Sequence, residues 1–72
     1  MDKFLEEIAE ILEEEQVNLN DKLIDFDAWD SLTQLSIIAL AGEEYGVMIS
    51  AVEIREAETV GGIKQLIDNK KA

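Results

Sequence analysis

Cysteine, histidine and proline are all missing from this chain of 72 residues. Without cysteine there is no disulfide framework, no thiolate nucleophile and no cysteine-ligated metal site. Without histidine, the side chain that most often serves as an acid or base near neutral pH is absent. The absence of proline favours uninterrupted helices. We therefore expect a helical protein that is not an enzyme and has no catalytic residue of its own.

Basic residues are scarce. Lysine and arginine total 6 against 17 aspartates and glutamates, which gives a formal net charge of −11. Such a surface repels the phosphates of nucleic acids and of anionic lipids, so we expect neither as a partner. It attracts proteins that carry basic patches and accelerates their encounter. The alternative is that the acidity only keeps a small domain soluble.

Long hydrophobic runs are also absent, since no segment approaches the roughly 20 apolar residues of a membrane span. Residues 1–7 lack the basic and apolar regions of a signal peptide, so we expect a cytoplasmic protein. The chain length predicts a single domain over residues 1–72, and we expect a monomer. An apolar share of 47% supplies enough hydrophobic side chains for a core.

Hydrophobic periodicity predicts two helices in the first two thirds of the chain. Apolar residues recur at helical spacing over residues 4–12. A second helix is expected to begin at Asp30 or Ser31 and to run to about Tyr45. Its apolar residues cover more than one face, so this helix is either central or keeps an apolar surface for a partner. Gly46 is suited to end it.

The intervening residues 17–29 form a long loop that we expect to pack on the core rather than to act as a flexible linker. Its expected apolar anchors are Leu19, Leu23, Ile24 and Phe26. The acidic run that starts at Asp25 resembles the start of a calcium-binding EF-hand loop. Trp29 takes the fifth place, Asp30 the glycine place and Ser36 the place of the final glutamate, so we expect no metal site.

Capping residues mark two further helices. Ser50 and Glu53 have the spacing of a capping box and predict a short helix. Thr59 predicts the start of a last helix. Gly61 and Gly62 in its first turn each cost about 1 kcal/mol relative to alanine, so we expect this turn to be comparatively mobile. The sequence thus predicts an all-α four-helix bundle with three longer helices, a short third helix and a long loop between the first two.

Ser31, at the start of the second helix, has two compatible interpretations. Either Asp30 or Ser31 can cap the helix. Alternatively, the serine is a modification site, because a phosphodiester at a helix start meets free N–H groups and the positive end of the helix dipole. A chain without a thiol can acquire one by carrying a prosthetic arm.

The segment DAWDSLTQLSIIALAGEEYGVMIS resembles the acyl carrier protein family. The family's phosphopantetheine attachment motif, Asp-Ser-Leu at the head of the second helix, is matched by Asp30, Ser31 and Leu32. The resemblance extends over nearly the whole chain. It implies that a phosphopantetheinyl transferase attaches 4′-phosphopantetheine from coenzyme A to Ser31, which makes the protein a phosphoprotein. It further implies a carrier that holds acyl or aminoacyl groups as thioesters and presents them to loading and processing enzymes with basic docking surfaces.

The resemblance also implies roles for other residues. Asp30 would help to orient the transferase, and Leu32 would be the apolar contact beside the arm. The remaining partner-recognition positions are Leu35, Ala39, Glu43, Glu44 and Ala57. The interior positions that would line an acyl chain are Ile37, Ala41, Ile49 and Ile63.

Departures from the family pattern bear on the pathway. Ala28 and Trp29 replace the usual Gly-Ala before the motif, and Thr33 and Ser36 replace acidic residues that fatty-acid synthase partners read. The resemblance therefore implies a specialised carrier, for instance polyketide-like or aminoacyl, rather than one for housekeeping fatty-acid synthesis. Trp29 is alternatively a core anchor of the loop. The rival function is an unmodified acidic adaptor that binds basic proteins through its second helix.

Overall fold

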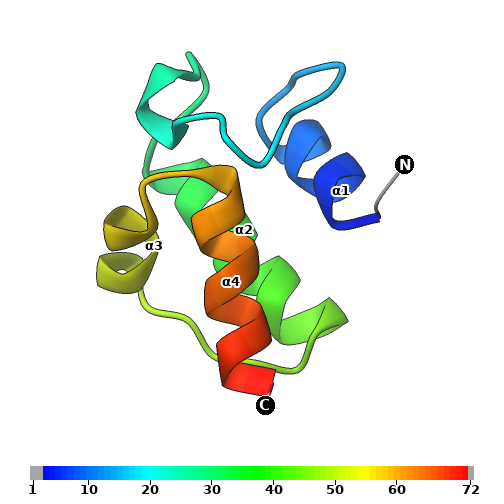
Figure 1. Cartoon of the computed structure of the whole chain (residues 1–72). Helices are drawn as coiled ribbons and strands as arrows, with labels where there is room; N and C mark the ends of the chain where they lie inside the picture. The colour runs from blue at the N-terminus through cyan, green and yellow to red at the C-terminus, as the bar shows by residue number, and fades with distance from the viewer. Residues whose placement is uncertain (1–2, 72) are drawn as a thin grey trace.

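A computed structural model describes residues 3–71, which form four α-helices and one short 3-10 helix. The order is α1 (Lys3–Ile11), η1 (Leu23–Asp25), α2 (Ser31–Glu44), α3 (Ala51–Ala57) and α4 (Val60–Lys71) (Figure 1). The all-α bundle with a short third helix is thus confirmed. The 3-10 helix η1 lies inside the long loop and was not predicted. None of the helices over residues 3–71 has the length and apolarity needed to cross a membrane.

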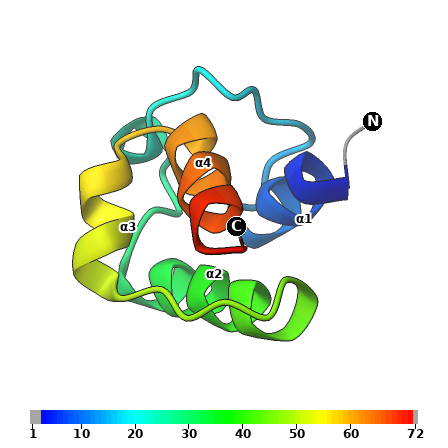
Figure 2. The same ribbon diagram turned by 60° about the horizontal axis from the view of Figure 1, so that its bottom comes forward.

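Each helix contributes one apolar side to a shared core. Phe4, Ile8 and the adjacent Leu12 from α1 are buried, as the periodicity predicts. Figure 2 shows α4 with α1 and α3 on either side and α2 beneath it. The buried side chains Ile63 and Ile67 of α4 belong to the same core cluster. No polar side chain among the described residues is buried.

The helix ends lie where the sequence places them. The Ser50 and Glu53 capping box forms at the start of α3, with each residue's amide bonded to the other's side chain. At the start of α4, Thr59 Oγ1 accepts a hydrogen bond from the Gly62 N–H at 2.9 Å. Gly46 follows α2 with φ of 67°, a left-handed conformation that glycine adopts without strain. These caps satisfy backbone groups that the helices leave free.

The loop between α1 and α2 has fewer apolar anchors than predicted. Leu23 is buried, and Phe26 and Trp29 pack partly buried against the core, which supports Trp29 as a loop anchor. The expected anchors Leu19 and Ile24 are wrong, because their side chains are 42% and 77% exposed.

Backbone hydrogen bonds replace those two anchors. The Gly61 N–H donates to the Leu19 carbonyl at 2.8 Å, and the Leu23 N–H donates to the Glu58 carbonyl at 2.9 Å. A third bond from the Val60 N–H to the Asp21 carbonyl measures 3.0 Å. The loop is therefore attached to the α3–α4 junction through its main chain, and the side chain of Leu19 stays partly exposed.

The same junction explains the two adjacent glycines. A Cβ atom at Gly62 would overlap the carbonyl of Ala57, and one at Gly61 would come within 2.9 Å of the Leu19 carbonyl oxygen. The glycines thus permit close approach of three backbone segments. From the sequence, only the cost of glycine inside a helix could be predicted. The mobility expected for this turn stays a prediction.

Candidate functional site

Ser31 is the first residue of α2, and its side chain is exposed. Asp30, which precedes it in extended conformation, is the N-cap. Asp30 Oδ1 accepts from the Thr33 N–H at 2.9 Å, while Thr33 Oγ1 accepts from the Asp30 N–H at 2.9 Å. Within residues 3–71 the Ser31 hydroxyl makes no hydrogen bond. The capping role therefore belongs to Asp30 and leaves the serine hydroxyl available for chemistry.

The backbone around Ser31 favours a negatively charged substituent. The first hydrogen bond of α2 runs from the Gln34 N–H to the Asp30 carbonyl at 3.0 Å, so the Ser31 and Leu32 amides precede it. The first turn of the helix contains no acidic residue. The positive end of the helix dipole and these amides attract phosphate oxygens. A phosphodiester on Ser31 fits the residues that are present.

Ser31 belongs to an exposed strip of α2 that we call the α2 stripe. Leu32 and Leu35 are 73% and 59% exposed, unusually high for leucine. Ala39 continues the same helical face, because residues 3, 4 and 7 positions apart align. The α2 stripe comprises the exposed residues Ser31, Leu32, Leu35, Ser36, Ala39, Gly42 and Glu43. The structure thus brings four of the expected recognition positions onto the face that bears the serine.

Glu44 is not part of this stripe. It is turned toward α1, where its Oε1 lies 3.4 Å from Lys3 Nζ. Partial burial, followed by the nearby Glu44 carboxylate, raises the pKa of Glu7. The Tyr45 hydroxyl also donates to Glu7 Oε1 at 3.3 Å. Glu44 therefore forms an ion pair with α1, whereas the neighbouring Glu43 belongs to the α2 stripe.

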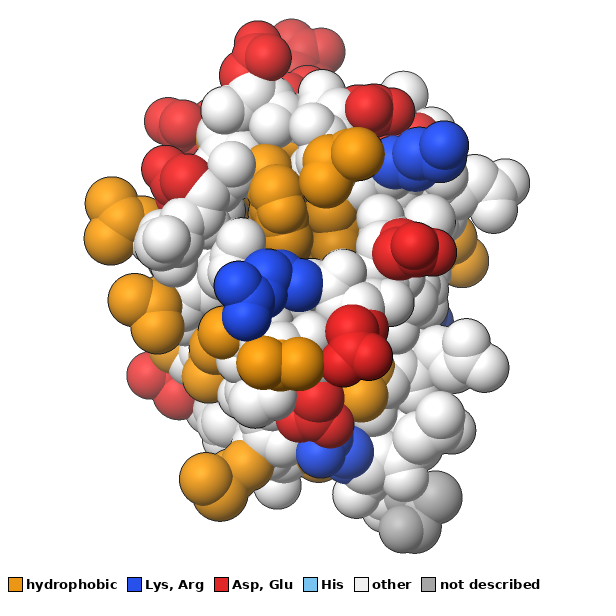
Figure 3. All heavy atoms as spheres, turned by 90° about the vertical axis from the view of Figure 1, so that its left-hand side faces the viewer, with side chains coloured by type: hydrophobic (Ala, Val, Ile, Leu, Met, Phe, Trp, Pro, Cys, Tyr) orange, Lys and Arg blue, Asp and Glu red, His pale blue; other side chains and the backbone are white. Residues whose placement is uncertain are grey.

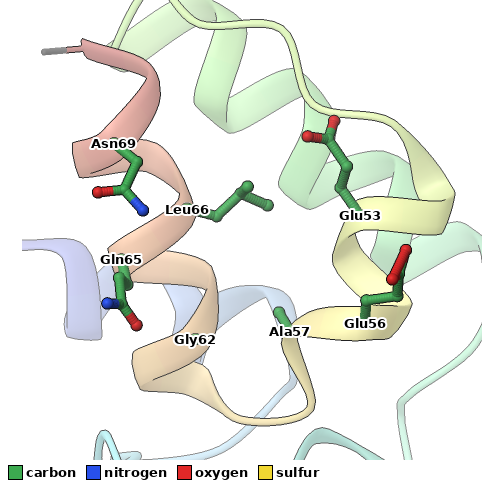
Figure 4. Close-up of a pocket in the computed structure, with 7 residues that line it drawn as sticks. All are labelled: Glu53, Glu56, Ala57, Gly62, Gln65, Leu66 and Asn69. Atoms are coloured by element: carbon green, nitrogen blue, oxygen red, sulfur yellow. The ribbon is translucent and has the colours of Figure 1, made fainter.

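Ala57 is half-buried and lies on the side of α3 that faces α4. There it lines a surface groove of about 280 Å³ (Figure 4). The groove is lined by Glu53, Glu56, Ala57, Gly62, Gln65, Leu66 and Asn69. Lys70 Nζ lies 3.0 Å from Glu53 Oε2. The Ser50 amide, together with Lys70, lowers the pKa of Glu53. The structure thus assigns Ala57 to a polar-edged groove rather than to the α2 stripe.

The four interior positions are all buried. Ile37, Ala41 and Ile63 are fully inaccessible, and Ile49 is 5% exposed. They belong to one core cluster with the other buried residues. Their contact with an acyl chain stays a prediction.

Sequence reasoning missed four residues of this region. Thr33 was considered only as a missing acid, although its position three residues after Asp30 could have indicated a cap partner. Met48 and Val52 are 90% and 53% exposed. The alternation Val47-Met48-Ile49, with buried residues on either side of an exposed one, is the signal for Met48. Arg55, exposed on α3, received no role.

An exposed serine at a helix start, with no acidic residue in the first turn, is compatible with the attachment of a phosphate-linked group. The family model for the phosphopantetheine attachment site matches residues 2–67, so the chain belongs to the phosphopantetheine-binding carrier family. Two curated relatives are acyl carrier proteins, from Tropheryma whipplei strains Twist and TW08/27. Each is 34% identical over 77 residues, which covers 99% of this chain and 94% of the relative. No solved structure matches the chain.

Membership of this family shows the general function of the protein. The protein is a carrier and not an enzyme, and its cofactor is covalently attached 4′-phosphopantetheine. Its interaction with a modifying transferase and with biosynthetic enzymes follows from the same membership.

Proposed function

We propose that Ser31 bears the 4′-phosphopantetheine arm and that the protein presents acyl or aminoacyl groups to the enzymes of one pathway. The observation that carries this assignment is the Ser31 hydroxyl, which is exposed and makes no hydrogen bond within residues 3–71, because Asp30 caps the helix in its place. When bound, the arm supplies the thiol that the chain lacks, and a thioester on that thiol is an activated acyl group.

The residues around Ser31 hold and present the arm. The Ser31 and Leu32 amides and the helix dipole stabilise the phosphodiester, which lowers the cost of keeping that charge near an acidic protein. The reciprocal bonds between Asp30 and Thr33 fix the first turn, so the attachment point is rigid. Leu32 lies beside the attachment point as an apolar contact. Tethering raises the effective concentration of the cargo at each partner active site.

Partner enzymes dock, in this proposal, on the α2 stripe. Leu32, Leu35 and Ala39 provide apolar contact area, and Glu43 at the far end of the stripe attracts a basic group. Glu44 contributes less than the family pattern implies, because it is paired with Lys3. Ile37, Ala41, Ile49 and Ile63 are the interior positions against which an acyl chain would pack.

The pathway we propose is a specialised one. Thr33 and Ser36 stand where fatty-acid carriers have acids, and both bond to the backbone of their own helix turn. Thr33 Oγ1 donates to the Asp30 carbonyl at 2.9 Å, and Ser36 Oγ donates to the Leu32 carbonyl at 3.0 Å. Neither offers a charge to a basic partner, which supports a role outside housekeeping fatty-acid synthesis.

Intact-mass spectrometry tests this function. The apo-protein is incubated with coenzyme A and a broad-specificity phosphopantetheinyl transferase. We expect the wild type to gain one phosphopantetheine and Ser31→Ala to gain none. No gain by the wild type, under conditions that modify a control carrier, would favour an unmodified acidic adaptor instead.

A further inference from the structure

The few cations of this protein are nearly all engaged by its own side chains. Lys3 pairs with Glu44, Lys64 with Asp68 and Lys70 with Glu53, while Lys71 lies 5.5 Å from the centre of the Tyr45 ring. Within residues 3–71, only the side chains of Lys22 and Arg55 have no such contact. On a chain with a net charge of −11, an exposed arginine without an ion pair is a distinctive feature.

Arg55 lies on the outer side of α3, away from the groove. Glu53 and Ala57 line the groove toward α4. Figure 4 shows them on the side of α3 that faces α4. At 100° per residue, Ala51 and Arg55 share the opposite flank of the helix. Val52 is next to this flank and is 53% exposed, so Arg55 has apolar surface on one side, and within residues 3–71 no carboxylate forms an ion pair with it.

The α2 stripe is uncharged near its serine. No charged residue occurs from Ser31 to Gly42, although the chain is strongly acidic elsewhere. Figure 3 looks onto the side of the molecule where α3 lies and shows hydrophobic side chains spread over this side, with both basic and acidic side chains among them. Met48, which precedes α3, is a further exposed apolar side chain at 90% exposure. Covering such a surface releases apolar area from water without desolvating an ion pair.

We propose that the α2 stripe, Met48, Val52 and Arg55 form one docking surface for a partner enzyme whose own surface is apolar and bears a carboxylate opposite Arg55. This inference rests on the proposed function, which places the arm on Ser31. It assigns the area near the arm a local charge preference opposite to that of the whole protein. The basic group that Glu43 attracts lies at the far end of the same surface. A second copy of the chain is a poor occupant, because it would bring an equal negative charge and a second Arg55 to the contact.

The test is a titration of the unmodified full chain with two helical peptides, followed by amide chemical shifts in nuclear magnetic resonance spectra. Both peptides present the same leucine face, and one is flanked by glutamates and the other by lysines. At 0.15 M salt the screening length is about 8 Å, so distant acids contribute little. We expect the glutamate-flanked peptide to shift the amides of the α2 stripe and of α3. Arg55→Glu should weaken that binding about fivefold.

Lys64→Glu on α4 is the control for charge, since it makes the same charge change away from this surface. It also breaks the exposed pair with Asp68, but it should leave the binding unchanged. Preferential binding of the lysine-flanked peptide to the area around Leu35 and Val52 would overturn the inference, as would the binding of neither peptide. Concentration-dependent shifts without peptide that Leu35→Asp removes would assign the surface to a second copy instead. Because the titration needs no arm, its failure leaves the test of Ser31 modification untouched, and the reverse also holds.

Discussion

Asp30 and Thr33 bond to each other in both directions across the first turn of α2, with each amide donating to the other's side chain at 2.9 Å. In the sequence, Thr33 stands only as the replacement of a recognition acid. In the structure Thr33 completes the capping box with Asp30, so the Ser31 hydroxyl is not needed as a cap.

Removing either half of this cap should destabilise the protein. We expect Asp30→Ala to lower the free energy of unfolding by about 1 kcal/mol and Thr33→Ala by a similar or smaller amount. Urea unfolding followed by circular dichroism measures both. Ser36→Ala is the control, because its hydroxyl bonds only the Leu32 carbonyl on an exposed surface, and its effect should stay within about 0.5 kcal/mol. Equal effects of all three variants would contradict the cap.

Substitution by alanine should change the stability of the protein in opposite directions at Gly62 in α4 and at Gly42 in α2. Gly62→Ala places a Cβ against the Ala57 carbonyl and should lower the free energy of unfolding by about 1–3 kcal/mol. This steric cost exceeds the stabilisation expected from the higher helix propensity of alanine. Gly42→Ala, where the nearest atom would be 3.9 Å away, should stabilise by about 0.5–1 kcal/mol. Thermal unfolding of the two variants checks this contrast. Stabilisation by Gly62→Ala would show that the backbone of the α3–α4 junction shifts at little energetic cost to make room for the Cβ atom.

The Glu7 and Glu44 carboxylates predict a pH dependence of stability. The pKa of Glu7 is raised above 4.5, chiefly by partial burial and then by Glu44. A raised pKa in the folded state means that its contribution to stability is complete below pH 4.5 and is lost as the pH rises through the folded-state value. Glu7→Gln removes this loss while keeping an acceptor for the Tyr45 hydroxyl. The variant should therefore be more stable at pH 7, by less than about 1 kcal/mol.

Urea unfolding of wild type and Glu7→Gln at several pH values measures that difference. The advantage of the variant should be largest near pH 7 and should shrink as the pH falls toward 4.5. A difference that is constant with pH would mean that the substitution acts through packing and not through charge.

Partner choice should depend on the exposed polar residues of the α2 stripe. Ser36→Glu restores an acid at a position that fatty-acid carriers use, and it adds a charge to an otherwise neutral stretch. We expect the holo-variant to be acylated faster than the wild type by a fatty-acid synthase loading enzyme, because a basic docking surface then finds a counter-charge. Steady-state acylation rates provide the measurement. Unchanged rates would mean that another residue determines which pathway the carrier serves, and Trp29 is the first candidate.

The sequence predicted the helices and their ends well, because periodicity and capping residues act locally. Periodicity also places Ile8 on the buried face of α1, whereas Ile63 was expected in the interior through the family resemblance. The sequence-based prediction failed for Leu19 and Ile24, because hydrophobicity alone does not reveal that backbone bonds to Gly61 and Glu58 hold the loop. Glu44 differs from Glu43, and Arg55 has no ion pair within residues 3–71, because of how the helices pack against one another. The pattern of a single helix does not contain this information.

The most direct measurement of the central claim is mapping of the modified residue by tandem mass spectrometry, after incubation with coenzyme A and a phosphopantetheinyl transferase. Ser31 and Ser36 are two exposed serines on one face of α2, so they form a matched pair. We predict phosphopantetheine on Ser31 alone, its loss in Ser31→Ala and its retention in Ser36→Ala. Modification of Ser31→Ala, or an arm found on any other residue of the wild type, would contradict the account.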